Sequence, residues 1–458
     1  MWWENKVMRT IRVRNAQKPG VIGHLLKAIG DAGGFVGEIT TVHFLTYHVD
    51  RDIVLFAEDE AHLEKLLEVT RSVPDVILLE VRDEVLEMHQ GGKIAVKSRY
   101  KIETLRDLRR VYTPGVANVC LKIRDDRQLA RRFTAIKHLV AIVTDGTAIL
   151  GLGDIGPLAG MPVMEGKASL METFVGLSGM PILLNTKDTR EIIETVVNIA
   201  PTFGAIQLED ISAPRCFEIE EELIRRLDIP VMHDDQHGTG VVVTATLINA
   251  SKLAGIDLRQ AQVGQIGLGA AGLSISKMLM NYTGKPVLGA DLSQDSLQRL
   301  EKAGGLRSTL EEIMQKADIV ISTTGVPGLI RKEMVRKGQI ILALSNPNPE
   351  IEPEDALSAG AVFAADGKVV NNVLGFPGIL RGAVDADVPR ITSDMYLAAA
   401  ETIAALAPEG ELVPSPLDKK VHRAVARAVA RVAVETGLAR ADLTEYFENT
   451  DGASSAAV

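Results

Sequence analysis

The sequence has few cysteines, no excess of positive charge and no long apolar run, and each shortage excludes a class of protein. Cys120 and Cys216 are its only cysteines, too few for a disulfide framework and typical of a reducing compartment. The net charge of −10 argues against a nucleic-acid partner, which would need a basic face. No apolar run has the length of a membrane span, and the first residues lack the apolar core of a signal peptide. We therefore expect a cytoplasmic protein with no nucleic-acid or membrane partner.

The first 90 residues have the pattern of a small separate module. Residue periodicity predicts two helices, at 21–32 and 60–72, and four strands, at 8–14, 35–45, 52–57 and 76–81. This βαββαβ order is that of a ferredoxin-like fold. With the loop at 15–20, which carries Pro19 and Gly20, it resembles the ACT domain, a regulatory module. The resemblance implies an amino-acid or metabolite effector at this loop, and a module used only for assembly is the alternative.

Two pairs of acidic residues follow two short apolar runs in the middle of the chain. Glu209 and Asp210 end the first run, and Asp234 and Asp235 end the second. If these runs are the strands of one βαβ unit, both pairs lie at the carboxyl ends of parallel strands, where α/β sheets place their sites. Carboxylates crowded there repel one another unless a cation neutralises them, and oxygen ligands favour Mg²⁺ or Mn²⁺. Two unrelated surface acid pairs are the alternative.

A dinucleotide-binding pattern follows. The strand predicted at 261–266 runs into a GxGxxG motif and a helix at 273–280, and the next strand, at 287–290, ends at Asp291. The three glycines allow the tight turn, the approach of the pyrophosphate and the packing of helix on strand, and they are Gly267, Gly269 and Gly272. Asp291 stands where a carboxylate accepts a hydrogen bond from the ribose 2′-hydroxyl and repels a 2′-phosphate. We therefore predict NAD⁺ as cofactor, with NADP⁺ less preferred.

Several other segments have both a functional and a structural interpretation. Tyr112 precedes a rigid Pro-Gly bend, and Lys167 lies in an apolar segment where it could be a general base. A packed ring and an exposed lysine are the structural alternatives. Asp145-Gly146-Thr147 predicts a hairpin turn after a strand at 139–144. The glycine-rich run that follows is not a dinucleotide fingerprint, because Pro157 and Leu158 replace the expected helix start. After Gly238-Thr239-Gly240 an apolar helix at 241–253 is expected to begin a new domain.

Taken together, these motifs resemble the malic enzyme family. The carrying segments occur in the family's order, and they are 112–116, 145–156, Gly166-Lys167, Glu209-Asp210, 233–239, 345–347 and 371–378. The resemblance implies that Tyr112 is the general acid and Lys167 the general base. It also implies that Glu209, Asp210 and Asp235 bind the divalent metal with Asp234 behind them, and that Asn346, Asn371 and Asn372 contact malate or the nicotinamide. One departure is Thr147-Ala148, where the larger branch of the family has an arginine that holds the substrate carboxylate.

The expected fold is α/β throughout. It comprises a ferredoxin-like ACT-like domain at 1–90, a malate- and metal-binding domain at 91–236, a Rossmann-type domain at 237–440 and a tail at 441–458. The expected reaction is the divalent-metal-dependent oxidative decarboxylation of L-malate to pyruvate and CO₂ with reduction of NAD⁺, by a homodimer or larger homo-oligomer. A dehydrogenase that does not decarboxylate would not need four acids, and a catalytically silent metabolite sensor would not need Tyr112 and Lys167.

Overall fold

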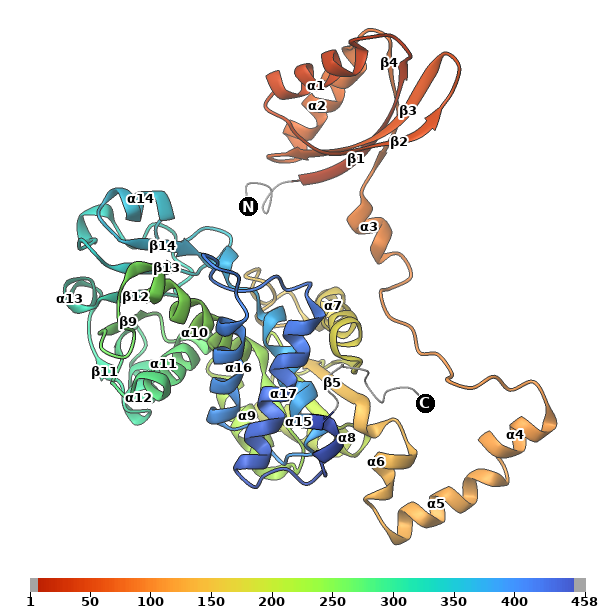
Figure 1. Ribbon diagram of the computed structural model, residues 1–458, viewed down its shortest axis with the longest axis vertical. Helices are drawn as coiled ribbons and strands as arrows, with labels where there is room; N and C mark the ends of the chain where they lie inside the picture. The colour runs from red at the N-terminus through yellow and green to blue at the C-terminus, as the bar shows by residue number, and fades with distance from the viewer. Residues whose placement is uncertain (1–6, 449–458) are drawn as a thin grey trace. The chain divides into compact units, whose positions relative to one another are not determined.

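The computed structural model describes residues 7–448, and the chain divides into two units at Lys93 and Ile94 (Figure 1). The first unit has the predicted βαββαβ order, with an antiparallel sheet of strand order β2-β3-β1-β4. One face packs Ile11, Ile53 and Leu55 against Leu25 and Leu66 of the two helices. The elements are β1 (Val7–Ala16), α1 (Val21–Asp31), β2 (Phe35–Phe44), β3 (His48–Ala57), α2 (Glu60–Ser72) and β4 (Val76–Arg82). The predicted ferredoxin-like fold is confirmed.

The other face of this sheet carries paired charges. The register sets Arg12 opposite Asp52 and Arg14 opposite Asp50. Each arginine binds its carboxylate through two hydrogen bonds, of 2.7 and 2.8 Å for Arg12 and 2.7 and 2.9 Å for Arg14. The Arg14 hydrogen bonds lower the pKa of Asp50 to about 2 against the opposing effect of burial. Arg82 adds a second cation beside Asp52, so the acids of this face are fully matched.

The second unit begins with helices that bury no residue. The connector between the units contains a short helix, α3 (Glu84–His89), that the sequence did not predict. The first helix after this connector begins at Leu105, where Thr104 and Asp107 form a capping box. The helices that follow are α4 (Leu105–Val111), α5 (Gly115–Asp125) and α6 (Leu129–Phe133). Among residues 7–448, no helix is long and apolar enough to cross a membrane.

The first sheet of this unit is parallel, with strand order β6-β5-β7-β8. Its elements are β5 (Leu139–Thr144), α7 (Pro157–Val175), β6 (Ser178–Leu183), α8 (Thr189–Ile199), β7 (Ala205–Leu208), α9 (Arg215–Arg226) and β8 (Val231–His233). The predicted hairpin after β5 is wrong, because both neighbours of β5 run parallel to it. A helix also begins at Pro157 where none was expected, since proline is well suited to the first helical position.

The second sheet is parallel and has the doubly wound order. Its strands lie in the order β11-β10-β9-β12-β13-β14, which puts the reversal of strand order between β9 and β12. The strands are β9 (Val263–Ile266), β10 (Leu288–Ala290), β11 (Leu306–Arg307), β12 (Ile319–Ser322), β13 (Ile340–Ala343) and β14 (Phe363–Asp366). The helices between them are α11 (Ala270–Thr283), α12 (Gln294–Lys302), α13 (Leu310–Lys316) and α14 (Pro353–Ser358). The predicted Rossmann-type fold is confirmed.

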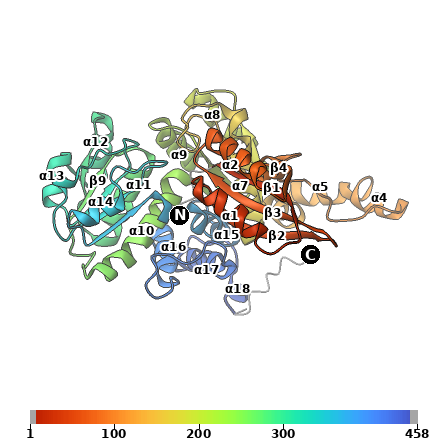
Figure 2. The ribbon, with the colours of Figure 1, turned by 90° about the horizontal axis from the view of Figure 1, so that it is seen from above.

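Helix α10 (Asp234–Ala254) joins the two sheets and begins earlier than the helix expected at 241–253. Its glycines do not end it, because they allow close packing. A Cβ at Gly238 would lie 1.9 Å from Asp234 Oδ1, and one at Gly240 would lie 2.8 Å from Ser274 Oγ. Residue 236, the expected domain boundary, therefore lies inside a helix. One apolar core spans both sheets and the closing helices, α15 (Phe376–Asp385), α16 (Ser393–Ala405) and α17 (Lys419–Glu435), which lie together in both views (Figure 2).

A short helix, α18 (Thr444–Glu448), follows within the expected C-terminal tail, and the rest of that tail lies outside the described residues.

Candidate active site

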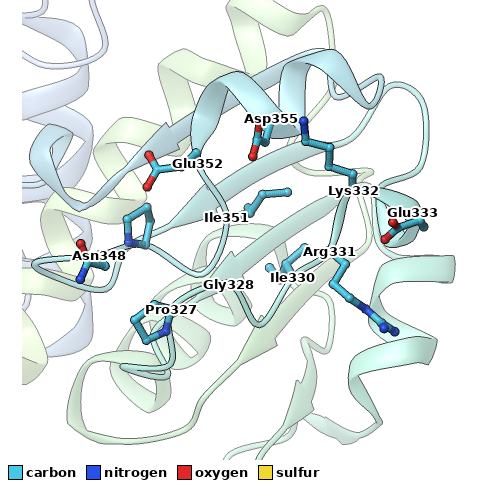
Figure 3. A pocket seen from close by; sticks show the side chains of 11 residues that line it. Pro327, Gly328, Ile330, Arg331, Lys332, Glu333, Asn348, Ile351, Glu352 and Asp355 are labelled. Atoms are coloured by element: carbon cyan, nitrogen blue, oxygen red, sulfur yellow. Dashed lines mark ion pairs between the residues drawn. The ribbon is translucent and has the colours of Figure 1, made fainter.

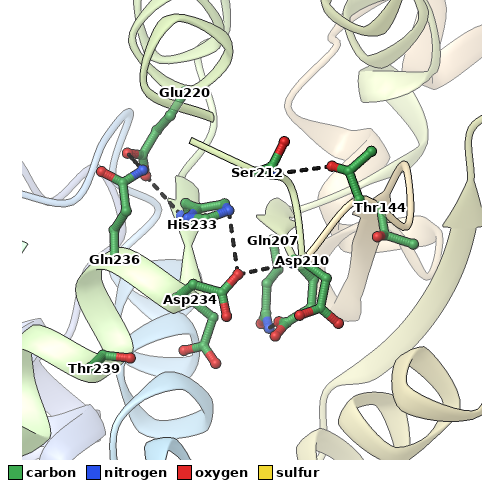
Figure 4. Close-up of polar contacts among 12 residues, drawn as sticks. Thr144, Gln207, Asp210, Ser212, Glu220, His233, Asp234, Gln236 and Thr239 are labelled. Carbon is green, nitrogen blue, oxygen red and sulfur yellow. Dashed lines mark hydrogen bonds and ion pairs between the residues drawn. The ribbon is translucent and has the colours of Figure 1, made fainter. Parts of the chain in front are cut away.

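The structure brings the predicted metal ligands together at the carboxyl edge of the first sheet. Glu209 and Asp210 follow β7, and Asp235 lies in the first turn of α10. One carboxylate oxygen from each lies within 4.8 Å of the others. The Asp210 backbone N–H donates to Asp235 Oδ2 at 2.9 Å, which ties the two strand ends together (Figure 4). Gln207 Nε2 donates to Glu209 at 2.6 Å. The cluster is buried apart from Asp235, which is partly exposed.

The electrostatics of this cluster fit a cation. Burial, together with the charge of the neighbouring Asp235, raises the pKa of Asp210 to about 7. Burial also raises the pKa of Glu209 and of Asp234. Asp210 Oδ2 is buried and makes no hydrogen bond to the described residues. A set of hard oxygen donors with an unsatisfied buried oxygen is suited to Mg²⁺ or Mn²⁺.

Lys167 projects from α7 into the same cluster. Its Nζ lies 3.0 Å from Glu209 Oε1 and forms a short ion pair with Asp234. The ammonium group also lies 4.5 Å from the centre of the Phe376 ring. Burial alone would lower the pKa of Lys167, but Asp234 and Glu209 raise it by more, so the net pKa is raised. The lysine therefore carries a proton that the carboxylates hold in place.

Asp234 depends on a residue that sequence analysis did not single out. Its Oδ1 lies in the space that a side chain at Gly238 would occupy, one helical turn further along α10. Glycine at this position leaves room for Asp234 Oδ1, while Oδ2 of the same carboxylate pairs with Lys167. The motif containing Gly238 was visible in the sequence, but its pattern gave no reason for a glycine inside a helix.

Thr147, which stands where the larger branch of the malic enzyme family has an arginine, is hydrogen-bonded to Arg215. Thr147 Oγ1 donates to Asp145 at 2.6 Å and accepts from Arg215 Nη2 at 3.0 Å. Arg215 lies at the start of α9 and also binds Asp145 at 2.8 Å. The Ala148 N–H donates to the Asp210 carbonyl at 3.0 Å, so this loop and the metal cluster are joined. A guanidinium is thus present near the cluster, from a helix remote in sequence.

The glycine motif opens α11 as predicted. A Cβ at Gly267 would lie 2.7 Å from the Thr323 carbonyl, and one at Gly272 would lie 1.9 Å from the Gly267 carbonyl. The same Cβ at Gly269 would meet nothing within 4 Å, which leaves space for a ligand. Asp291 lies at the end of β10, where Oδ2 accepts from the Leu268 N–H and Oδ1 from the Ser293 N–H, both at 2.7 Å. Each oxygen keeps a lone pair for a ribose hydroxyl.

The predicted asparagines lie on the loops between the two sheets. Asn372 exchanges hydrogen bonds with Thr239 of α10 at 3.0 and 3.3 Å, and the Asn371 side chain accepts from the Val373 N–H. A Cβ at Gly151 would lie 3.3 Å from the carbonyl of Asn346, so the glycine-rich loop of the first sheet meets the loop after β13. That loop is fastened by buried Glu350, which accepts from Ser345 Oγ at 2.6 Å.

Tyr112 is a predicted site residue, but no described contact joins it to Lys167 or to the cluster of carboxylates. It follows α4 and is 67% exposed. Among residues 7–448, no described hydrogen bond joins its hydroxyl to Lys167 or to the carboxylates. A cavity of about 420 Å³ lies elsewhere, between the loops after β12 and β13, and is lined by Ile330, Lys332, Ile351 and Asp355 (Figure 3). It contains no predicted site residue.

Comparison with known proteins identifies the family. Residues 91–224 match the malic enzyme N-terminal domain, and residues 291–436 match the malic enzyme NAD-binding domain. NAD-dependent malic enzyme 1 of Bacillus subtilis is 54% identical over 93% of this chain and 98% of its own. NAD-dependent malic enzyme of Geobacillus stearothermophilus is 42% identical over 94% and 96%. The crystal structure of malic enzyme from Pyrococcus horikoshii, 38% identical, covers 80% of this chain and 96% of its own with a TM-score of 0.74. The chain belongs to the malic enzyme family.

Proposed function

We propose that this chain catalyses the oxidative decarboxylation of L-malate to pyruvate and CO₂, with a divalent metal ion and NAD⁺. The observation that carries the proposal is the contact of one buried lysine with a group of carboxylates that could hold a metal. The same unit contains a doubly wound sheet with a dinucleotide motif at its switch point. An alcohol can therefore lose a proton to the lysine and a hydride to the cofactor at one site.

Glu209, Asp210 and Asp235 would hold Mg²⁺ or Mn²⁺, and Asp234 would orient Lys167 from behind them. When bound, the metal supplies a Lewis acid at the oxygen on C2 of the substrate. Lys167 would take the proton of the substrate hydroxyl, and bound NAD⁺ would supply the acceptor for the hydride from C2. The carboxylates that raise the pKa of Lys167 include those that the metal would neutralise. We therefore expect Lys167 to act as a base only when the metal is bound.

Tyr112 would donate a proton to C3 after CO₂ has left. It lies on a segment whose helices bury no residue and whose side chains at Tyr100, Leu105 and Tyr112 are 65%, 74% and 67% exposed. A folded protein seldom leaves so much apolar surface uncovered. We infer a homodimer or larger homo-oligomer, in which this segment covers a second copy and brings Tyr112 to the Lys167 of that copy.

The cofactor and the substrate would bind between the two sheets. Gly267, Gly269 and Gly272 would accommodate the pyrophosphate, and Asp291 would accept the ribose hydroxyl, which favours NAD⁺ over NADP⁺. Asn346, Asn371 and Asn372 would contact malate, pyruvate or the nicotinamide. Asn372 is already oriented by Thr239 of the helix that carries the metal ligands.

Regulation, substrate binding and cofactor binding would each belong to a separate domain. We propose residues 1–90 as an ACT-like regulatory domain with an amino-acid or metabolite effector, which the separate unit ending at Lys93 supports. Residues 91–236 would form the malate- and metal-binding domain, 237–440 the NAD-binding domain and 441–458 a tail. Because α10 crosses residue 236, the two catalytic domains would share one helix.

The test is the purified chain with L-malate, NAD⁺ and Mn²⁺, following NADH and pyruvate together. We expect equal amounts of NADH and pyruvate, and no turnover after chelation of the metal. Formation of NADH with oxaloacetate as the accumulated product would instead indicate a dehydrogenase that does not decarboxylate.

A further inference from the structure

Glu220 is a buried residue of α9. All the described hydrogen bonds of its carboxylate are with the segment 233–237. It accepts from the His233 N–H at 2.7 Å and from Gln236 Nε2 at 2.9 Å (Figure 4). It also lies 3.0 Å from His237 Nε2. The residue is 5% exposed. A buried carboxylate is costly unless it is fully hydrogen-bonded, and here three partners come from five consecutive residues.

These five residues form the start of α10. His233 is the residue before the helix, and its side chain makes no capping hydrogen bond. Glu220 accepts from the backbone N–H of His233, the N-cap residue, and so takes from a neighbouring helix the place that the N3 carboxylate has in a capping box. The next two residues are Asp234, which binds Lys167, and Asp235, which accepts from the Asp210 N–H. A small rotation of this turn would move both carboxylates at once.

The segment is also supported from its other side. The ring of His237 stacks on that of Tyr396 in α16, with centroids 4.5 Å apart and planes 2° from parallel. Burial alone would raise the pKa of Glu220, but the contacts with His237 and His233 together lower it by more, so the net pKa is lowered and the group stays ionised. The turn is thus held between α9 and α16 by contacts that do not involve the metal ligands.

We infer that Glu220 is a positioning residue for the metal site: it fixes the first turn of α10 so that Asp234 and Asp235 face Lys167, Glu209 and Asp210. The inference rests on the proposed metal site. Glu220 would contact neither metal nor substrate. Its loss should weaken metal binding, because partners that orient metal ligands are worth about 10- to 100-fold in affinity.

The test compares Glu220→Gln with a control variant of a buried polar side chain on α10, Asn249→Ala. Asn249 is buried near the other end of α10 and donates to the carbonyls of Ala404 and Leu412 at 2.8 and 2.9 Å. Mn²⁺ affinity is measured by the EPR signal of the free ion, NAD⁺ affinity by calorimetry and stability by thermal unfolding. In Glu220→Gln the amide would present a donor to other donors, so we expect the Mn²⁺ Kd to rise about 10- to 100-fold. The NAD⁺ Kd should not change, and Asn249→Ala should lose stability with an unchanged Mn²⁺ Kd.

The outcomes separate the two proposals. If the wild-type chain does not bind Mn²⁺, or binds it as well after Asp235→Asn, the proposed metal site is wrong. If the wild type binds Mn²⁺ and Glu220→Gln binds it equally well, or Asn249→Ala weakens it as much, the positioning role is overturned. If Glu220→Gln does not fold, Gln236→Met removes one of the three partners instead. A Kd raised about 10-fold would then support the role, and an unchanged Kd would overturn it.

Discussion

The chain contains two clusters of carboxylates, and they are balanced in opposite ways. On the sheet of the first unit, Asp50 and Asp52 each bind an arginine through two hydrogen bonds, and the pKa of Asp50 is lowered to about 2. In the second unit a single lysine faces four carboxylates, and burial raises the pKa of three of them, Glu209, Asp210 and Asp234. Both clusters lie at the ends or faces of strands, so position alone does not distinguish them.

The difference between the clusters is what makes one of them a site. Matched charges stabilise the sheet and leave no group free to bind another ion. Unmatched, buried charges cost folding free energy, and a protein keeps them only where binding or chemistry compensates for that cost. The charge imbalance therefore supports the proposal of a metal site at Glu209, Asp210 and Asp235, whereas the arginine-paired cluster has no such imbalance.

The largest expected effect is that of Asp235→Asn. It should lower kcat by about 10³-fold or more, because it removes a charged metal ligand. The melting temperature of the metal-free protein should not fall, since the substitution also removes repulsion within the cluster. Steady-state kinetics with a Mn²⁺ titration measure the effect, with Asp52→Asn as control. If Asp52→Asn lost as much turnover as Asp235→Asn, the distinction between a catalytic and a structural cluster of carboxylates would be wrong.

A second large effect should come from mixing two inactive variants. Lys167→Ala lacks the base and Tyr112→Phe the acid, and each should be nearly inactive for malate oxidation to pyruvate. If each site combines groups from two copies, each mixed dimer contains one intact site of two. Mixed dimers make up about half of a random mixture, so the mixture should recover about one quarter of wild-type activity. Subunits are exchanged in mild denaturant and assayed. No recovery in verified mixed dimers would mean that Tyr112 acts within its own copy or not at all.

Asp291 differs from both clusters of carboxylates. Each of its two oxygens accepts one hydrogen bond from a backbone N–H and can accept another. Asp291→Ser should therefore narrow the preference for NAD⁺ over NADP⁺ by roughly 10-fold, through loss of a hydrogen bond and of repulsion. The measurement is kcat/KM for both cofactors at saturating malate and Mn²⁺. A wild type that prefers NADP⁺ would show that this carboxylate does not face the ribose.

The pH dependence of stability should also distinguish the clusters. The pKa of Asp210 is raised from 3.8 to about 7, so this group contributes stability that is present below about pH 4 and is lost as the pH rises toward 7. The metal-free second unit should thus melt a few degrees lower at pH 8 than at pH 5. Saturating Mn²⁺ should abolish the difference, as followed by calorimetry. An unchanged pH dependence with Mn²⁺ would contradict the assignment.

The smallest expected effect is that of Asp50→Asn in the full chain. Because the pKa of Asp50 is lowered, its stabilisation persists down to about pH 4 and disappears toward pH 2. At neutral pH the loss of the Arg14 pair should lower hydrogen-exchange protection in β1 and β3 by about 3- to 10-fold. Turnover should not change. An effect on kcat without an effector would show that this face is not purely structural.

Local pattern predicted much of the fold. The helix predicted at 60–72 is α2 and the strand predicted at 139–144 is β5, because periodicity and capping are encoded within each segment. The start of α10 could not be predicted in this way. Its glycines indicate a helix end when read locally, whereas their cause is contact with Asp234 and with α11.

The candidate site shows the same limit. The acid pairs could be located because parallel strands end at a common edge. Glu220 could not, since it is one of several glutamates in the segment 218–222 and only the packing of α9 buries this one. Tyr112 was found by resemblance, and the described contacts leave its side chain exposed and outside the cluster.

Helix α10 connects the two ligand sites mechanically. Its first turn carries Asp234 and Asp235, and its body packs on α11, the helix that opens at the dinucleotide motif. If NAD⁺ binding moved α11, the packing of α10 on α11 would carry that movement to the first turn of α10. We therefore expect thermodynamic linkage: whatever factor NAD⁺ contributes to Mn²⁺ affinity, Mn²⁺ must contribute equally to NAD⁺ affinity.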